Sequence, residues 1–218
     1  NNPSTNNSSA FALIAGKTEI DPPGGGTPLR RSLFGGYFVS GIGSGQAYAY
    51  VGTKYDHDNT GAGGTNYKIL GDGTVSTIVK DKDNNPRIMF APEAPEVLFQ
   101  DYGIGKLVNG TAVIKLDEIL SRNILVDNTH PLKVFIQLEG DCNGVYVTNK
   151  SDKGFTVKEL QNGNSDVTFS WQIVATRANS KDTNGEITSH FENLRFPIGP
   201  NLVQEPGFKS KEVKKEET

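Results

Sequence analysis

The sequence predicts an all-β protein of fibre type, in which a β-sandwich-like C-terminal module follows a smaller glycine-rich β module. The clearest strand is residues 166–177, where apolar and polar residues alternate with the period of a half-buried strand. Its apolar positions are Val167, Phe169, Trp171, Ile173 and Ala175. Turn dipeptides separate further short runs of this kind, and 25 of the 218 residues are glycine. Only 35% of the residues are hydrophobic when glycine is left out, and the fraction stays below the roughly 45–50% of ordinary globular domains even when glycine is counted, so turns are numerous and cores are thin.

Composition divides the chain into five segments. Residues 1–29 are a polar linker with a tether strand, and residues 30–90 form the small glycine-rich β module. Residues 91–96 (APEAPE) are a stiff connector, because each proline fixes its own φ and disfavours the α conformation of the preceding residue. Residues 97–200 form the β-sandwich-like module, and residues 201–218, rich in Lys and Glu, are a disordered charged tail. Chains with thin cores often complete them against other copies, so we expect oligomerisation.

The first half of the chain alternates strands with glycine-rich turns. The apolar run at residues 10–15 (AFALIA) is a candidate strand. Residues 33–51 combine aromatic and β-branched side chains with glycine, which favours closely packed strands and loops over helix. Residues 65–70 and 74–80 predict two strands paired through the turn at residues 71–73 (GDG).

Two segments of the first half have the composition of ligand loops but fit ordinary turns better. A glycine-rich stretch at residues 41–45 is followed by Ala-Tyr-Ala-Tyr-Val instead of the helix that a phosphate loop needs. Residues 81–86 (DKDNNP) begin with the spacing of a calcium loop, but Pro86 stands where that loop needs glycine and Pro92 where it needs glutamate. We therefore predict a turn at residues 81–86, followed by a short strand at residues 88–90.

The second module begins with a hairpin and a short helix. Asn109-Gly110 separates the apolar runs 106–108 and 111–116, and this dipeptide is the strongest short-range hairpin signal because both central positions of a type I′ turn need φ > 0. Residues 117–123 (DEILSRN) form the one passable helix of the chain. Asp117 can cap its first turn, because aspartate is a preferred N-cap residue.

The next strand of this module carries an aromatic side chain on its solvent face. Residues 131–138 alternate, so we expect the inward side chains to be Leu132, Val134, Ile136 and Leu138. Phe135 then points outward with its polar neighbours. Turn sequences at residues 139–144 and 151–154 lead into two further short strands, at residues 145–147 and 155–157.

Several runs of this module resemble a known group of proteins. These are Val97–Ala112, Gly140–Val147, Gly154–Val157 and Trp171–Arg177, with Thr65–Ile69, Thr74–Val79 and Phe90–Glu96 upstream. The pattern resembles the C-terminal β module of bacterial and phage tail-fibre-like or adhesin-like surface proteins, over roughly residues 30 to 200. The resemblance implies a fibre end or stalk-proximal module that is trimeric and lies outside the cell. It implies no catalytic residue.

Charge and composition argue against several other classes of protein. The net charge is −3, with acidic and basic residues interspersed, so we expect no basic face and no nucleic-acid partner. Cys142 is the only cysteine, which excludes an intrachain disulfide and a cysteine-cluster metal site. We expect no metal and no cofactor, because His57, His130 and His190 lie in loop-like stretches with no two at ligand spacing. The sequence has no run of about 20 apolar residues, so we expect no membrane insertion.

Exposed aromatic residues are the best candidates for a binding site. Sugars bind β surfaces by stacking on aromatic faces with a few polar groups beside them. Tyr48, Tyr50, Tyr55 and Phe135 are the residues that we nominate. The competing interpretation of each is a subunit interface, where Tyr and Phe are equally common.

These observations favour a non-enzymatic structural or binding module of an extracellular fibre or adhesin. We expect it to assemble as a homotrimer, to recognise glycans or a receptor on a cell surface, and to lie at a cell surface or on a virion or injection-machine appendage.

Two alternatives stay open. The first is a carbohydrate-active enzyme of sandwich architecture, for which Asp101, Glu139 and Asp141 are the available carboxylates; such a pair needs a cleft and a separation of about 5–10 Å. The second is a capsid or filament subunit that polymerises by donating residues 10–15 as an added strand.

Overall fold

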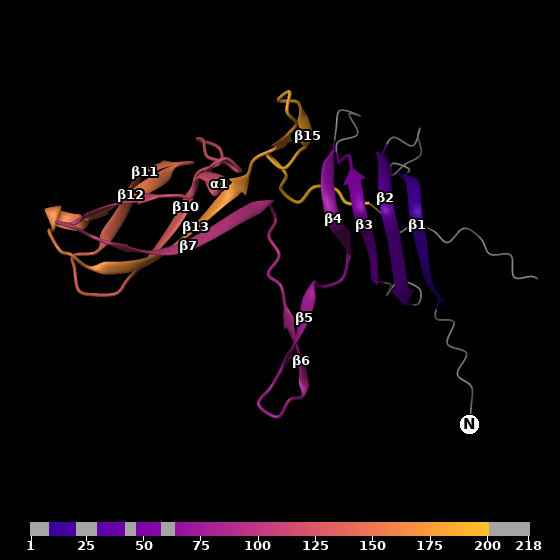
Figure 1. Cartoon of the computed structure of the whole chain (residues 1–218), viewed down its shortest axis with the longest axis horizontal. Coiled ribbons are helices and arrows are strands. Elements are labelled where there is room, and N and C mark those ends of the chain that lie inside the picture. The colour runs from indigo at the N-terminus through magenta and orange to yellow at the C-terminus, as the bar shows by residue number, and fades with distance from the viewer. Residues whose placement is uncertain (1–8, 21–29, 42–46, 58–63, 201–218) are drawn as a thin grey trace, which may run out of the picture. The chain divides into compact units, whose positions relative to one another are not determined.

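The computed structural model of the chain describes residues 9–20, 30–41, 47–57 and 64–200 (Figure 1). Strands account for 57% of the structure and helices for 4%, which confirms the all-β class. The chain forms two compact units that interleave in the sequence. Of the described residues, the first contains 9–20, 30–41, 47–57, 67–73 and 198–200, and the second contains 64–66 and 74–197, including the proline-rich connector.

The first unit is built on one sheet with the strand order β1-β2-β3-β4. These strands are β1 (Ser9–Ile20), β2 (Arg30–Gly41), β3 (Ala47–Tyr55) and β4 (Thr65–Asp72). The predicted strand at residues 10–15 lies within β1, which pairs antiparallel with β2. Aromatic rings dominate the small core, which consists of Phe34, Tyr37, Val39 and Tyr50 with Tyr48 packed against it. The predicted glycine-rich stretch at residues 42–45 lies outside the described residues.

The pairing predicted between residues 65–70 and 74–80 is wrong. Both strands exist, but β4 joins the sheet of β3, while β5 (Ser76–Lys80) pairs with β6 (Pro86–Phe90). The turn at residues 81–86 explains why β5 pairs with β6 and not with β4, because this turn brings β6 directly back alongside β5. Asp81 Oδ1 accepts hydrogen bonds from the backbone N–H groups of Asp83 and Asn85, both at 2.9 Å, and Asn84 supplies the positive φ of 63° that the turn needs. This segment is therefore a turn, as predicted.

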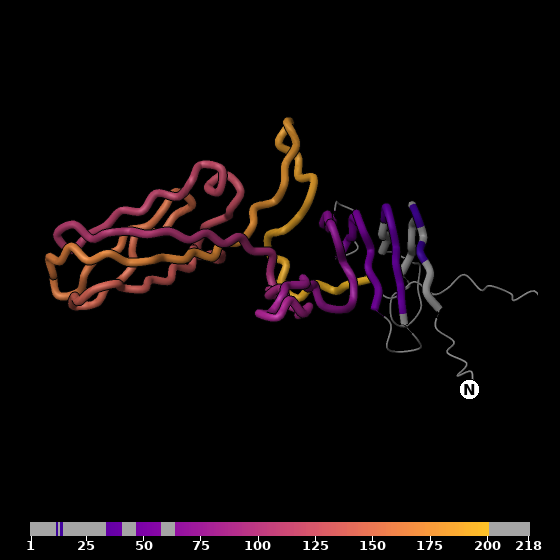
Figure 2. Tube along the Cα trace, turned by 60° about the horizontal axis from the view of Figure 1, so that its bottom comes forward, coloured from indigo at the N-terminus to yellow at the C-terminus, as the bar shows by residue number. Residues whose placement is uncertain are grey.

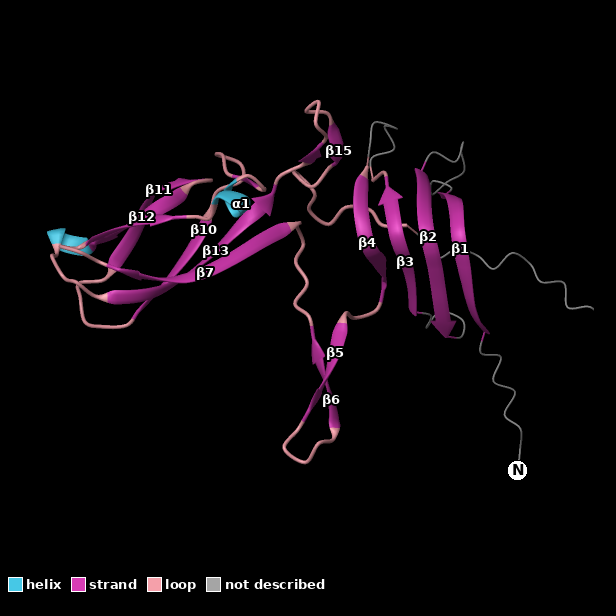
Figure 3. Cartoon of the chain, viewed as in Figure 1, coloured by secondary structure: helices cyan, strands magenta, loops and turns pink. Residues whose placement is uncertain are grey.

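The second unit contains a sandwich of two sheets (Figures 1 and 3). One sheet has the order β10-β13-β7, with β9 on the end of β13, and the other has the order β11-β12-β8. The bounds of the first are β7 (Leu98–Lys106), β9 (Ile124–Leu125), β10 (Lys133–Leu138) and β13 (Thr168–Arg177). Those of the second are β8 (Thr111–Lys115), β11 (Val145–Ser151) and β12 (Gly154–Glu159). A short hairpin of β14 (Ser180–Lys181) and β15 (Ile187–Ser189) follows, within the orange loop that projects from the sandwich in Figure 2.

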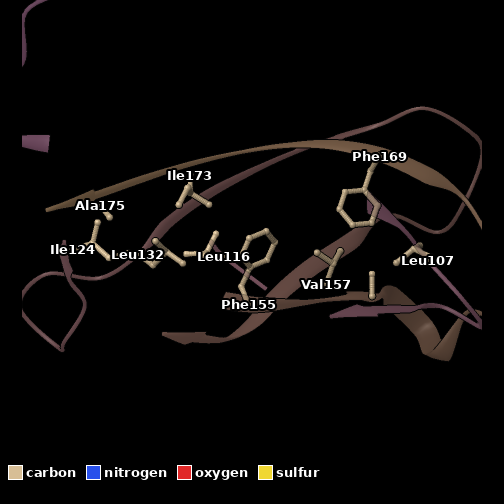
Figure 4. Packing of buried hydrophobic residues seen from close by; sticks show 10 residues of the cluster. Leu107, Leu116, Ile124, Leu132, Phe155, Val157, Phe169, Ile173 and Ala175 are labelled. Carbon is tan, nitrogen blue, oxygen red and sulfur yellow. The ribbon is translucent and has the colours of Figure 1, made fainter. Parts of the chain in front are cut away.

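Side chains from both sheets share one core (Figure 4). Its buried members are Leu107, Ala112, Leu116, Ile124, Leu132, Phe155, Val157, Phe169, Ile173 and Ala175. The long strand β13 contributes three of them, on the face that its alternation predicts. Trp171, on the same face, packs edge-on against Phe155 with ring centroids 5.7 Å apart. The core therefore holds the two sheets together, and β13, the central strand of the sheet β10-β13-β7, contributes most to it from that sheet.

The predicted turn at Asn109-Gly110 is confirmed and links the two sheets, but the predicted hairpin is not, because the runs beside the turn pair at one position only. Both residues have positive φ, 49° and 73°, and Val108 and Thr111 exchange both backbone hydrogen bonds across the turn. Beyond that single pair the strands part, so that β7 pairs with β13 while β8 pairs with β12. The short helix is also confirmed as α1 (Glu118–Ser121), capped by Asp117 Oδ1, which accepts from Ile119 N at 2.7 Å.

Candidate functional site

In the middle of strand β7, Gly103 and Gly105 face the core while Tyr102 and Ile104 face solvent. Gly103 and Gly105 pair with Trp171 and Phe169 of β13. A Cβ atom on either glycine would lie 2.4 Å from the ring of its partner, so the two rings occupy the space that side chains of β7 would otherwise fill. Because side chains alternate along a strand, the residues between and beside the glycines point to the opposite face.

The outer face of the sheet β10-β13-β7 therefore carries exposed apolar side chains. Tyr102 and Ile104 of β7 are 66% and 74% exposed, and Phe135 of β10 is 57% exposed. The strand register places Tyr102, Gln172 and Phe135 side by side across the three strands. The adjacent row is Ile104, Ser170 and Gln137.

A depression of about 490 Å³ lies over these two rows. Tyr102 and Phe135 stand on strands to either side of β13, so their backbones are separated by about 10 Å, twice the spacing of neighbouring strands. The two rings can thus contact successive units of an extended ligand, while Gln172 lies between them. We call this surface, with Gln137 and Ser170, the outer aromatic face.

Polar groups of the outer aromatic face are arranged to exchange hydrogen bonds with a ligand. Gln172 donates to Gln100 Oε1 at 3.3 Å, and the Tyr102 hydroxyl donates to the same oxygen at 3.4 Å. Both bonds are long for their type, so a ligand group can replace them at small cost. Ser170 donates to the carboxylate of Glu139. None of the described residues that line the depression carries a charged side chain.

The structure places the four nominated aromatic residues in two different settings. Phe135 is exposed on the outer aromatic face, as predicted. Tyr50 and Tyr55 are fully buried, so the expectation that they are exposed is wrong. The rings of Tyr37 and Tyr50 pack with centroids 4.8 Å apart, and Tyr55 packs edge-on against His57 at 4.9 Å.

Tyr48 is half-buried and its hydroxyl is engaged. It donates to the carbonyl oxygen of Pro200 at 3.0 Å. Burial, chiefly, and the nearby carboxylate of Asp72 raise the pKa of the Tyr48 phenol. Tyr48, Tyr50 and Tyr55 thus serve to pack the first unit. They differ from Phe135 in being buried or half-buried, whereas Phe135 is exposed to solvent.

The carboxylates considered for a glycosidase site are not brought together as a catalytic pair. Asp101 pairs with Ile173 on one side of β13, whereas Glu139 follows β10 on the other side and donates its backbone N–H to Thr168. Their partners on β13, Ile173 and Thr168, are five residues apart, so the two carboxylates are offset along the strands by roughly 17 Å. This is well beyond the range of about 5–10 Å for paired carboxylates. Asp141 is exposed in the loop after Glu139.

The side chains of the three histidines are half-buried. His130 Nδ1 lies 3.0 Å from Asp127 Oδ1, and its Nε2 lies 3.1 Å from Asn193 Oδ1. Nδ1 of His57 forms a hydrogen bond with the carbonyl oxygen of Ile198, and its Nε2 forms one with the hydroxyl of Tyr67. Across the described ranges, no group of three or more His, Cys, Asp or Glu is placed to hold a metal ion.

The carboxyl group of Asp127 has a strongly lowered pKa. Its Oδ1 accepts from the hydroxyl and N–H of Thr129 and from the N–H of His130, at 2.7–2.8 Å. These bonds, led by that of the Thr129 hydroxyl, lower the pKa of Asp127 from 3.8 to about 2. The arrangement orders the loop before β10 and is structural, because every partner lies in the same short segment.

Comparisons with protein-family models, with curated proteins and with solved structures found no match to this chain. In the part of the chain that the structure describes, no helix has the length and apolar character needed to span a membrane.

Sequence reasoning missed Tyr102, Ile104 and Gln172. The signal was present in residues 102–105 (YGIG), where large side chains alternate with glycine. Ordinary hydrophobic patterning would place the large residues inside, and only the pairing with Trp171 and Phe169 shows that the glycines face the core.

Proposed function

We propose that this chain is a non-enzymatic binding module of an extracellular fibre or adhesin, and that its outer aromatic face binds neutral surface glycans. The observation that carries the proposal is the row of Tyr102, Gln172 and Phe135, in which two exposed rings flank an amide. The aliphatic faces of sugar rings stack on aromatic side chains, and sugar hydroxyls bond with amides.

The chemistry of the lining selects the class of sugar. The described lining has no charged side chain to pair with a carboxylated or sulfated sugar, and it offers the amides of Gln137 and Gln172 and the hydroxyl of Ser170. A shallow, open surface of this kind binds each ligand weakly. In a homotrimer, three such faces would raise the avidity towards a glycan-coated surface.

The fibre context rests on two further observations. The runs around residues 97–112 and 171–177 resemble tail-fibre-like and adhesin-like modules, and the chain has few apolar residues to complete its own cores. We therefore assign it to a homotrimeric appendage of a cell surface, virion or injection machine. One competing role is that another protein subunit covers the same face. The exposed aliphatic side chain of Ile104, beside the two rings, favours this role.

The other two functions have less support. The distance between Asp101 and Glu139 disfavours a glycosidase built on this pair. For a filament that donates residues 10–15, the support is weakened because these residues lie in β1, which already pairs with β2 of its own chain.

A binding experiment tests the proposal. Cellohexaose, maltohexaose and chitohexaose are titrated into the full chain by calorimetry, after a glycan array has shown which neutral chains are retained. We expect Phe135→Ala and Tyr102→Ala each to weaken binding about fivefold or more, since each loses a stacking contact worth about 1 kcal/mol or more.

The matched control is Tyr146→Ala. Tyr146 lies on β11 of the opposite sheet and is also exposed, so its loss should leave affinity unchanged. Equal effects of Phe135→Ala and Tyr146→Ala, or no retained glycan, would overturn the assignment of the face. Shortened sugars after incubation would instead favour the enzyme.

A further inference from the structure

The two rings of the outer aromatic face have one strand between them. Tyr102 of β7 and Phe135 of β10 both lie opposite Gln172 of β13, so the three positions form one row across the sheet. Neighbouring strands lie about 5 Å apart, which places the two aromatic positions about 10 Å from each other. A ligand that contacts both rings must therefore cross the strands along this row.

The side chains next to the row give no second path for stacking. On the same face, the next residue of β7 after Tyr102 is Ile104, and the next residue of β10 after Phe135 is Gln137, because side chains alternate along a strand. Neither of them is aromatic. Two rings are available only along the row, so the row sets the direction of a ligand that stacks on both.

Gln100 orients the ring and the amide of this row in the free protein. Its Oε1 accepts from the Tyr102 hydroxyl at 3.4 Å and from Gln172 Nε2 at 3.3 Å. The Tyr102 side chain therefore leans along its own strand toward Gln100 and still leaves the residue 66% exposed. A ring that is oriented before binding loses less conformational entropy when a ligand stacks on it.

The polar groups beside the row suit a ligand with hydroxyl groups along its edges. The hydroxyl of Ser170 donates to Glu139, so its oxygen is left to accept from a ligand. Gln137 and Gln172 each supply an amide donor and an amide acceptor. Lys133, in the row on the other side, is not part of the lining of the depression.

The spacing of the two rings fits a β-1,4-linked sugar chain. Each unit of such an extended chain advances it by nearly the distance between neighbouring strands, and each unit is turned by about half a turn relative to the one before. The first and third units thus present the same face, two strand spacings apart, and can stack on the two rings. An α-1,4-linked chain curves into a helix, so its first and third units do not share a plane and only one of them can stack.

We propose that the outer aromatic face binds β-1,4-linked glycans through three successive subsites, at Tyr102, Gln172 and Phe135. This inference rests on the proposed function, because it names the linkage class of the neutral glycan that the face binds. The separation of the two rings selects the linkage, and the amide of Gln172 contacts the middle unit.

The dependence of affinity on chain length tests the three subsites. Cellobiose, cellotriose, cellohexaose and maltohexaose are titrated into the full chain by calorimetry. Cellobiose reaches one ring and cellotriose reaches both, so we expect cellotriose to bind about fivefold or more tightly than cellobiose, and cellohexaose to exceed maltohexaose by a similar factor. Equal affinities within either pair would overturn the proposal. If the array selects chitin fragments, chitobiose, chitotriose and chitohexaose replace the cello-oligosaccharides.

Two variants connect the length dependence to the row. Phe135→Ala should make cellotriose bind like cellobiose. The swap Phe135→Gln/Gln137→Phe keeps two rings on the face but moves one by two residues, roughly 7 Å along β10, and it should lose the advantage of cellotriose as well. Tyr146→Ala, on the opposite sheet, should retain it. An advantage that persists in the swapped variant would show that the row does not select the ligand.

Failure of this inference and failure of glycan binding can be told apart. If maltohexaose binds as tightly as cellohexaose, and Phe135→Ala weakens both, the glycan site is retained and the linkage class is rejected. If neither the hexasaccharides nor the shorter sugars bind, both proposals are rejected.

Discussion

Two phenylalanines of one sheet have opposite surroundings. Phe169 of β13 is fully buried between the sheets of the sandwich, whereas Phe135 of the neighbouring strand β10 is 57% exposed. The inner face explains why the sandwich folds, because its rings and aliphatic side chains form one core. The outer face contributes little to that core, and an exposed cluster of large apolar residues is typical of an interaction site. The residues that stabilise the sandwich and the binding site that we propose thus lie on opposite faces of the same three strands.

The largest effect should come from the inner face. Phe169→Ala removes a fully buried ring and leaves a cavity, so we expect the free energy of unfolding to fall by about 3–5 kcal/mol. Trp171 is the only tryptophan and packs against Phe155 in the same core, so its fluorescence during urea unfolding reports on the sandwich alone. A loss below about 1 kcal/mol would contradict the assignment of Phe169 to the core.

A glycine on the inner face should be the next most sensitive position. Gly105→Ala places a methyl group 2.4 Å from the Phe169 ring, and the buried ring has little room to move. We expect a loss of about 1–3 kcal/mol from overpacking, measured by the same unfolding curve. The control is Gly199→Ala, because a Cβ atom there meets nothing within 4 Å; its curve should match the wild type.

Acid should affect stability through the loop before β10. The pKa of Asp127 is about 2 in the folded protein, below its ordinary value of 3.8. Its ionised carboxylate therefore stabilises the fold above about pH 4, and this contribution is lost as the pH falls from about 4 to 2. We expect Asp127→Asn to lower the Tm at pH 6 and to have a much smaller effect at pH 2. The exposed Asp141, changed to Asn, serves as the control; a Tm difference for Asp127→Asn that is constant with pH would reject this role.

The smallest effect on stability should come from the outer face. Phe135→Ala and Tyr102→Ala should each change the free energy of unfolding by no more than about 0.5 kcal/mol, as is usual for exposed positions. The same urea curves measure both. A loss like that of Phe169→Ala would mean that the outer face also holds the fold together, and the contrast between the faces would fail.

Local sequence signals predicted most of the individual strands. The alternation of β13, the outward position of Phe135, the Asn109-Gly110 turn and the helix capped by Asp117 all follow from period, turn chemistry and capping within a few residues. Such signals act between near neighbours in the chain, so sequence alone is sufficient to find them.

Pairing and burial could not be predicted in the same way. Whether residues 65–72 pair forward with β5 or back with β3 depends on distant edges, and the turn signal at residues 71–73 pointed the wrong way. Tyr50 and Tyr55 have sequence surroundings as polar and glycine-rich as an exposed site, yet ring packing buries them. The outer aromatic face was missed because its existence depends on glycines of β7 that make room for rings of β13, which is a contact between residues more than 60 positions apart.

The most direct measurement is methyl NMR of the chain labelled at isoleucine, titrated with the hexasaccharide that the array selects. Ile104 lies on the outer aromatic face and Ile173 lies in the core of the same sheet, so the two methyl signals compare the faces in one spectrum. Binding at the outer face predicts that the Ile104 signal shifts with sugar concentration while the Ile173 signal stays in place. An unmoved Ile104 signal in the presence of bound sugar would place the binding site elsewhere and contradict the division of roles between the two faces.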